Sequence, residues 1–285
     1  MTRKSLFHFA LVGLLWGIPY LLMKVAVEDF PPAAVVAGRT LIGASILIPI
    51  AIYRKKFGGA VLGFKYVAFY ALMEMIGPWI LITTAEQKIN SGLAGLLVST
   101  VPIFATIITS LRGDHSVWQF KRILGIVVGF IGLILVVGIE SLSGNSDPLS
   151  IAMVIVASMG YAYAVIMVTS NLPLVDGIAI NGLAMAITTV FWAPVAIAQW
   201  PSSISMNSAL SLIALGIFST ALAFILFFKV MAEIGPARSS LVTYLNTAIA
   251  VLLGVIILRE PLTVGIIVGL PLVLVGSYLA SRKTV

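Results

Sequence analysis

The stretch FHFALVGLLWGIPYLLMKVAV at residues 7–27 decides the fold class, because it carries a single acidic or basic residue, Lys24. A helix of about 20 apolar residues is long enough to cross the hydrocarbon core of a bilayer. The stretch is too long for the apolar core of a signal peptide, and no small-residue cleavage site follows it. We therefore expect a membrane-spanning helix here.

The composition extends this expectation to the whole chain. Of its 285 residues, 60% are hydrophobic and 9% are charged, whereas a soluble domain carries about 25% charged residues. Ten apolar segments have the length of a span, at residues 7–27, 33–53, 64–84, 92–111, 121–140, 149–170, 178–199, 208–229, 237–258 and 263–281. The connections between them are too short for a soluble domain. The sequence predicts an all-α membrane protein with ten transmembrane helices.

The positions of Lys and Arg predict the orientation of these helices. With the N-terminus inside, 13 of the 17 cations fall on the inner side, three fall outside and Arg39 lies within a span. Cytoplasmic loops of membrane proteins are enriched in Lys and Arg. We expect both termini in the cytoplasm, and we interpret the net charge of +7 as this bias rather than as a nucleic-acid-binding surface.

A weak internal repeat divides the chain into halves at residues 1–145 and 146–285. STVPIFA at 99–105 aligns with LNTAIAV at 245–251, and the same frame sets Asp114 over Glu260. Five spans per half is an odd number, so the second half should insert upside down. Inverted repeats are typical of transporters that bind their substrate between the halves. The alternative is a duplication that was retained only for folding.

Several short elements carry a resemblance to a known family. They are Gly13–Gly17, Arg39, and the elements Leu111-Arg112-Gly113-Asp114 and Leu258-Arg259-Glu260-Pro261 that end the fourth and ninth spans. In their order they resemble the drug/metabolite transporter superfamily of the EamA type. The resemblance implies a basket of ten helices around a central cavity, and export of amino acids, other metabolites or drugs without ATP. Ala248 departs from the pattern, because Pro102 stands at the equivalent position of the first half.

Two charged residues within spans are candidates for a proton or substrate-ammonium site. Glu74 lies near the middle of the third span and Arg39 lies in the second. A charged side chain at the centre of a membrane helix costs about 2.5–3.5 kcal/mol on insertion scales. Something must offset this cost. The alternatives are a structural Glu74–Arg39 ion pair and a carboxyl that stays protonated.

Polar and aromatic side chains that share helix faces are the candidates for lining a substrate cavity. Aromatic rings can hold an apolar body, and polar tips can orient it. The candidates are Trp16, Tyr20, Glu74, Pro78, Trp79, Ser99, Tyr161, Tyr163, Phe224, Tyr244 and Asn246. The alternative is that the Tyr and Trp residues form belts at the membrane interfaces.

Glycine and proline residues inside spans are candidates for hinges, namely Gly17, Pro19, Gly77, Pro78 and Pro102. Proline removes a backbone hydrogen bond and can kink a helix. In a membrane the freed carbonyl must find a partner in protein or in cavity water. A static bend is the alternative.

We predict from these features a secondary transporter in the inner membrane that exports amino acids or related amphipathic metabolites. The alternatives are an exporter of drugs or lipophilic cations and a passive facilitator or channel. Enzyme motifs such as HExxH, a nucleophile elbow or a P-loop are missing from the sequence. With two histidines and no cysteine we expect no metal and no cofactor. The GxxxG pairs are compatible with a monomer or a homodimer.

Overall fold

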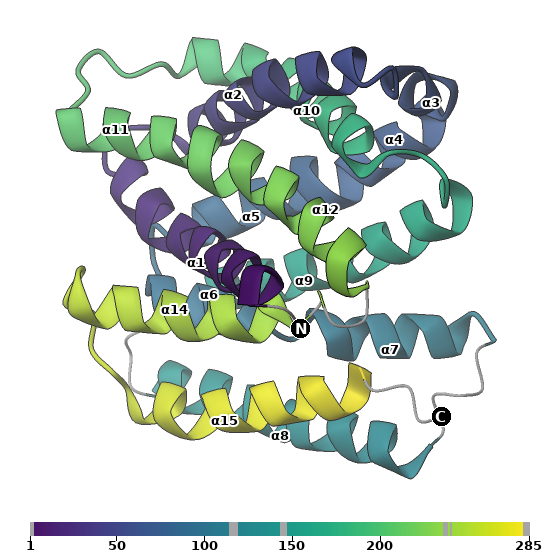
Figure 1. Cartoon of the computed structure of the whole chain (residues 1–285). Coiled ribbons are helices and arrows are strands. Elements are labelled where there is room, and N and C mark those ends of the chain that lie inside the picture. The colour runs from purple at the N-terminus through teal and green to yellow at the C-terminus, as the bar shows by residue number, and fades with distance from the viewer. Residues whose placement is uncertain (1–2, 114–118, 143–146, 236–238, 240, 282–285) are drawn as a thin grey trace.

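The structure, a computed structural model, describes residues 3–113, 119–142, 147–235, 239 and 241–281. Every regular element in this part of the chain is a helix (Figure 1). Helix lies over each of the ten segments predicted as spans, which confirms the all-α class.

The helices of residues 3–142 come first. They are α1 (Arg3–Ala26), α2 (Pro32–Tyr53), α3 (Phe57–Leu62), α4 (Phe64–Ala71), η1 (Leu72–Ile76), α5 (Gly77–Ala85), α6 (Ser91–Val98), α7 (Val101–Leu111) and α8 (Phe120–Leu142). Those of the remaining chain are α9 (Pro148–Asn171), α10 (Gly177–Ala198), α11 (Met206–Ala214), η3 (Leu215–Leu222), α12 (Ala223–Ile234), α14 (Val242–Ile256) and α15 (Val264–Ser281).

Seven helical stretches of the described residues are long and apolar enough to cross a membrane. They are α1, α2, α4–η1–α5, α6–α7, α9, α10 and α11–η3–α12. Two further apolar helices, α14 and α15, are shorter. Crossing by all ten predicted segments therefore stays a prediction.

Three of the predicted spans are interrupted rather than uniform α-helices. The third and eighth contain the π-helical segments η1 and η3, in which the helix widens locally. The fourth breaks at Ser99 and Thr100, so that Pro102 lies in the first turn of α7, where its missing N–H costs no hydrogen bond. By contrast, α14 passes without a break through Ala248, the position aligned with Pro102.

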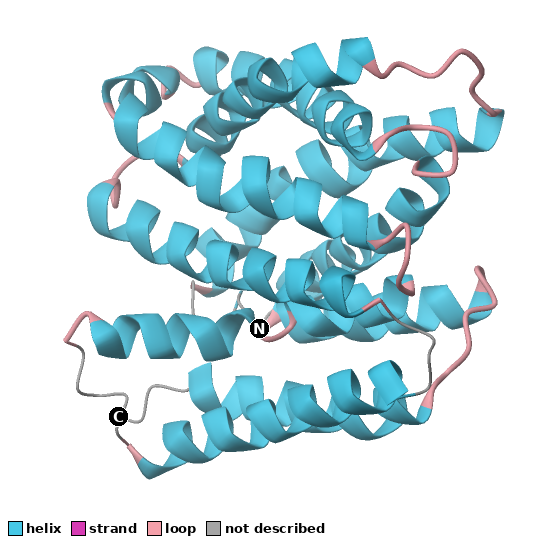
Figure 2. Ribbon diagram, turned by 180° about the vertical axis from the view of Figure 1, so that it is seen from behind, coloured by secondary structure: helices cyan, strands magenta, loops and turns pink. Residues whose placement is uncertain are grey.

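The helices pack in pairs that are far apart in sequence. α2 packs along α10, α1 along α14, and α8 along α15. The α8–α15 pair lies at one edge of the molecule in both views (Figures 1 and 2). A Cβ at Gly276 of α15 would collide with the backbone of Gly129 in α8, so glycine at both positions lets the two backbones touch.

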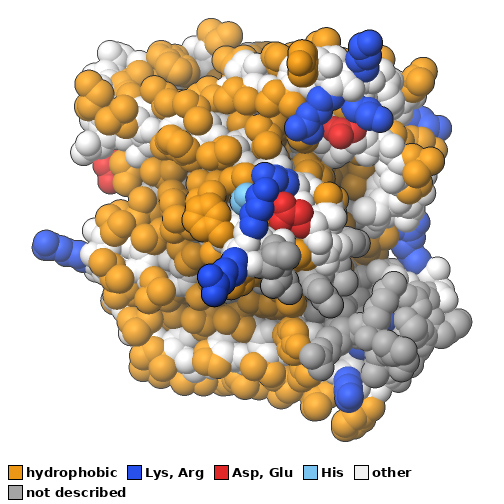
Figure 3. Space-filling model, viewed as in Figure 1, with side chains coloured by type: hydrophobic (Ala, Val, Ile, Leu, Met, Phe, Trp, Pro, Cys, Tyr) orange, Lys and Arg blue, Asp and Glu red, His pale blue; other side chains and the backbone are white. Residues whose placement is uncertain are grey.

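The surface is as apolar as the composition requires. Figure 3 shows hydrophobic side chains over most of the visible face, with most visible Lys and Arg side chains toward the right of the view. Large apolar side chains such as Leu41, Val190 and Ile256 are more than half exposed. Lipid tails can cover such a surface without a free-energy cost, whereas its contact with water would be unfavourable.

Candidate functional site

Arg39 lies inside the bundle and is held by three helices. It is 6% exposed. Its Nε and Nη2 donate to Thr220 Oγ1 of η3 at 3.3 and 3.2 Å, and its Nη1 contacts Met23 Sδ of α1 at 3.5 Å. The guanidinium carbon lies 3.8 Å from the ring centroid of Trp79 in α5. This cation–π contact compensates part of the cost of burying the charge.

Three aromatic side chains lie around this arginine, and the carboxyl of Glu74 lies within electrostatic range of one of them, Tyr161. Tyr20 and Trp79 are buried, and Tyr161 of α9 is hydrogen-bonded to Trp79. Tyr20 and Tyr161 lie within electrostatic range of Arg39, and Tyr161 lies within range of Glu74. We call Tyr20, Arg39, Glu74, Trp79 and Tyr161 the central cluster. All five were predicted from the sequence.

Glu74 projects from η1 and does not pair with Arg39. Ion pairs within the described ranges join His8 to Glu233 and Lys88 to Asp147, but none involves Glu74. The Glu74 Oε2 atom is buried and has no hydrogen-bond partner. The structural ion pair considered from the sequence is thus not formed here, and one oxygen of the carboxyl is left without a partner.

The chain around η1 explains how Glu74 is positioned. Pro78 has no N–H, so it cannot bond the carbonyl of Glu74 four residues earlier, and the helix widens before it. Trp192 Nε1 of α10 donates to the carbonyl of Ile76 at 3.1 Å. A Cβ at Gly160 of α9 would lie 2.8 Å from the Met73 carbonyl oxygen, so glycine lets α9 press against this segment. Widened turns of this kind are frequent at functional sites.

A second polar contact beside Glu74 was missed from the sequence. The Tyr70 hydroxyl donates to Asn181 Oδ1 of α10 at 3.1 Å, and both side chains are buried. Asn181 Nδ2 in turn donates to the Gly177 carbonyl at 2.9 Å. The sequence signal that could have located this bond is an asparagine near the start of an apolar span.

Glu86 and Lys24 extend the polar groups to the end of the bundle where α1 and α5 end. Lys24 Nζ donates to the backbone carbonyls of Glu86 and Ile89 at 2.6 and 2.9 Å. Glu86 is fully buried, and neither carboxyl oxygen has a hydrogen-bond partner. Sequence reasoning placed it in a connection and missed it. The spacing of Trp79, Thr83 and Glu86, which puts them on one helix face, was the usable signal.

Glu260 has a structural role at the same end. It follows α14, and its carboxylate accepts hydrogen bonds from Ser91 N and Ser91 Oγ at 2.8 and 2.9 Å and from Gly92 N at 3.2 Å. A carboxylate at a helix N-terminus satisfies free N–H groups and matches the helix dipole. Its counterpart in the repeat, Asp114, lies outside the described residues.

Three other predicted cavity residues, Trp16, Tyr163 and Tyr244, pack against aromatic side chains of other helices. Trp16 packs against Phe224 and Phe227 of α12, with ring centroids 5.6 and 4.6 Å apart. Tyr244 packs against Tyr278. Tyr163 is 37% exposed and packs on Phe69, away from the cluster.

Two further predicted residues, Ser99 and Asn246, are engaged in local bonds. Ser99 Oγ donates to the Leu96 carbonyl, and the Ser99 carbonyl accepts from Ser277 Oγ. Asn246 Oδ1 accepts from Thr247 Oγ1 at 3.3 Å. The Ser277–Ser99 bond joins α15 to the break between α6 and α7, whereas the Asn246 bond is to the adjacent residue.

The hinge candidates lie within a continuous helix, directly after a π-helical segment, or directly after a helix break. α1 stays helical through Gly17 and Pro19, and Gly17 packs closely against Ile249 of α14. Gly77 and Pro78 begin α5 directly after η1. Pro102 follows the break between α6 and α7. Hinge motion at these positions stays a prediction.

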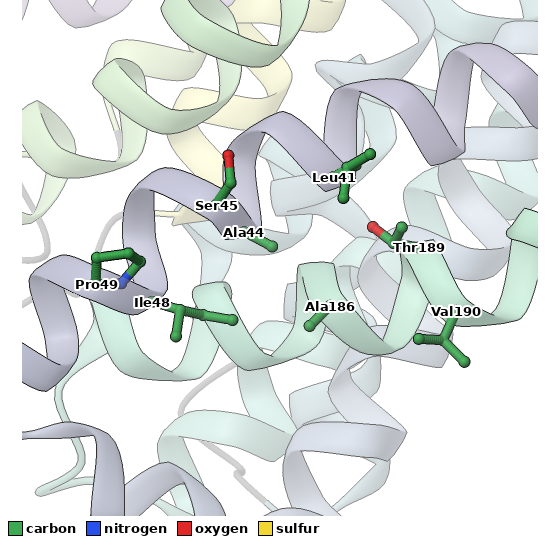
Figure 4. Close-up of a pocket in the computed structure, with 8 residues that line it drawn as sticks. All are labelled: Leu41, Ala44, Ser45, Ile48, Pro49, Ala186, Thr189 and Val190. Atoms are coloured by element: carbon green, nitrogen blue, oxygen red, sulfur yellow. The ribbon is translucent and has the colours of Figure 1, made fainter.

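A groove of about 380 Å³ lies between α2 and α10 (Figure 4). Its lining is almost entirely apolar and comprises Leu41, Ala44, Ser45, Ile48, Pro49, Ala186, Thr189 and Val190. It lacks charged residues and is separate from the central cluster. In a bilayer, lipid tails suit such a groove better than a polar solute does.

Comparisons with known proteins agree with a transporter. The model of the EamA-like transporter family matches residues 3–138 and 148–282. The "Uncharacterized transporter YoaV" of Bacillus subtilis (strain 168) is 27% identical over 94% of this chain and 93% of its own length. The "Uncharacterized inner membrane transporter YedA" of Escherichia coli (strain K12) is 26% identical over 95% and 91%. A solved crystal structure has the same fold, with a TM-score of 0.67, 15% identity, and coverage of 98% of this chain and 97% of that one.

Proposed function

The chain belongs to the EamA-like transporter family, and from this premise we propose that it exports amino acids or related amphipathic metabolites by alternating access. It is a membrane transporter. The proposal adds the class of solute, the direction and the mechanism.

The central cluster is the observation that carries this proposal. It places a buried cation, an unpaired carboxyl and three aromatic rings in contact or electrostatic range inside the bundle. Charged groups inside a membrane protein are costly and mark pathways for solutes or protons. Rings beside opposite charges suit a solute that has an apolar body and charged ends.

We also propose the arrangement in the membrane. Two inverted five-helix halves, 1–145 and 146–285, are supported by the two separate matches of the family model. The distribution of Lys and Arg supports cytoplasmic termini. An inner-membrane location is supported by the name of the relative YedA. A monomer or a homodimer fits the glycine-rich helix faces.

Counterflow in liposomes tests the class of solute. Purified protein is reconstituted with unlabelled phenylalanine inside, and uptake of labelled phenylalanine is measured against neutral amino acids, lipophilic cations and sugars. We expect transient accumulation that bulky neutral amino acids block. Accumulation blocked by lipophilic cations alone would favour the drug-exporter alternative, which the aromatic rings and Glu74 also suit. Uptake that never exceeds equilibration would favour a facilitator.

Glu74→Gln tests whether the carboxyl of η1 takes part. The amide has the same shape but cannot exchange a proton. We expect the variant to fold and to lose the pH dependence of export between mildly acidic and mildly alkaline conditions. Identical pH profiles of the two proteins would remove Glu74 from the mechanism.

A further inference from the structure

A carboxyl and a guanidinium, Glu86 and Arg39, are buried in the bundle without an ionic partner. Glu86 is 0% exposed and both of its carboxyl oxygens lack a hydrogen-bond donor. Arg39 is 6% exposed and forms no ion pair with any carboxylate of the described residues. Burying an uncompensated charge is strongly unfavourable. A ligand that supplies the missing charges would recover this cost.

The guanidinium of Arg39 has donors left for such a ligand. It presents five N–H groups. Its contacts with Thr220 Oγ1 and Met23 Sδ use three of them, at 3.2–3.5 Å. Its flat face lies on Trp79, which leaves the donors at its edge. Guanidinium edges bind carboxylates through two parallel hydrogen bonds.

The charged groups around Glu86 are bound elsewhere. Lys24 Nζ donates to backbone carbonyls and not to the Glu86 carboxyl. The Glu260 carboxylate accepts from Ser91 and Gly92. Burial raises the pKa of Glu86; Lys24 and Arg39 act in the opposite direction, and Glu260 acts in the same direction. None of these groups occupies the carboxyl oxygens, so an incoming cation can.

Arg39, Glu86 and Tyr20 each lie within electrostatic range of the other two. We propose that Arg39 and Glu86 together bind a zwitterionic α-amino acid, with its carboxylate on Arg39 and its ammonium on Glu86. The rings of Tyr20 and Trp79 flank its apolar side chain. This inference rests on the proposed function, and it names the groups that recognise the solute. The helices must separate to admit the ligand, as alternating access requires.

Three ligands of similar shape test the inference on the full-length protein in liposomes. They are phenylalanine, phenethylamine, which lacks the carboxylate, and 3-phenylpropanoate, which lacks the ammonium. Equilibrium binding is measured by competition with labelled phenylalanine. We expect either single-charge compound to bind at least about tenfold more weakly than phenylalanine, because each leaves one buried charge unpaired.

Two variants assign the charges. Glu86→Gln should weaken phenylalanine and phenethylamine by at least about tenfold and leave 3-phenylpropanoate unchanged. Arg39→Lys, which keeps the charge but loses the planar pair of donors, should weaken phenylalanine and 3-phenylpropanoate and spare phenethylamine. Glu28→Gln is the matched control, because Glu28 is an exposed carboxylate in the connection before α2.

The outcomes separate this inference from the proposed function. Amino-acid counterflow with unchanged ligand preference in Glu86→Gln would overturn the inference and leave amino-acid export standing. Absence of binding and counterflow for phenylalanine and all other amino acids tried would overturn both. If a variant does not fold, the wild-type comparison still decides, because equal binding of phenylalanine and phenethylamine would overturn the role of Arg39.

Discussion

The two π-helical segments, η1 and η3, lie in two long apolar helices, and their polar side chains differ in hydrogen bonding. In η1 the Glu74 carboxyl keeps an unpartnered oxygen. In η3 the Thr220 hydroxyl accepts two hydrogen bonds from Arg39. Both segments hold a buried oxygen without a hydrogen-bond partner, Glu74 Oε2 in η1 and Ser219 Oγ in η3, but only η3 also anchors a buried cation. The two segments thus differ in that the unpartnered group of η1 is ionisable, whereas η3 binds a guanidinium.

The residues that pack against the two segments also differ. Against η1 the neighbour is glycine, since a Cβ at Gly160 would lie 2.8 Å from the Met73 carbonyl oxygen and 3.0 Å from Pro78. Against η3 the neighbour is Gly43, whose Cβ would lie 2.6 Å from the flexible Met185 sulfur and 2.9 Å from Thr220 Cγ2. A thioether can move aside, whereas a backbone carbonyl cannot move without rebuilding its turn.

The largest expected effect follows from this difference. Gly160→Val should lower the free energy of unfolding by about 3 kcal/mol, at the upper end for overpacking a core, and should abolish export. Gly43→Val should cost clearly less, because Met185 can adjust. Thermal unfolding in detergent measures both. Equal losses would mean that η1 is no more rigidly held than η3.

A smaller effect tests the anchoring role of η3. Thr220→Val keeps the shape of the side chain but removes the acceptor of two N–H groups of a buried guanidinium. We expect a loss of about 2 kcal/mol, in the range of a hydrogen bond to a charged group. Ser219→Ala is the matched control, since the buried Ser219 hydroxyl has no partner. A loss as large in the control would contradict the assignment to Arg39.

The smallest effect concerns how the two composite helices begin. The N–H of Ser205, the N-cap residue of α11, donates to the Asp29 carboxylate at 2.9 Å, whereas α4 has no side-chain cap. Hydrogen bonds from the Ser205 side chain and backbone, and from Ser208, lower the pKa of Asp29. The stabilisation is thus present above the ordinary pKa of an aspartate and is lost as the pH falls through the lowered value.

Asp29→Asn should therefore reduce the difference between the Tm at neutral pH and the Tm at acidic pH. We expect a slightly lower Tm than wild type at neutral pH and the same Tm in acid, where the wild-type carboxylate is protonated. Tm measured across this range checks it. A constant gap at every pH would mean that the charge of Asp29 is irrelevant to α11.

Much of the central cluster could be predicted from residue type and depth alone. A charged side chain within an apolar span is unfavourable in contact with lipid and is therefore expected to face the interior of the bundle. This reasoning placed Arg39 and Glu74 inside the bundle. It could not give their partners. An Arg39–Glu74 ion pair was one alternative from the sequence, but in the structure Arg39 contacts Trp79 and Thr220, because contacts between helices depend on rotation about each axis.

Rotation also explains the uneven outcome for neighbouring residues. Tyr161 and Tyr163 are two positions apart on α9, about 200° around an ideal helix, so one faces the cluster and the other lies outside. The prediction that Glu74 and Pro78 share a helix face with other cavity candidates assumed a regular α-helix. The π turn changes that register; Pro78 signalled a disturbed helix but not that the turn before it widens. Glu86 was missed because a carboxyl next to a connection is ordinarily solvated.

The carboxylate of Glu260 has one more consequence. The first amides of a helix usually exchange their hydrogens with solvent within moments, because no carbonyl protects them. Here the amides of Ser91 and Gly92 are covered by a side chain from the far end of the chain. Deuterium uptake at these two amides should therefore report when the start of α6 and the end of α14 move apart. The measurement needs no attached probe.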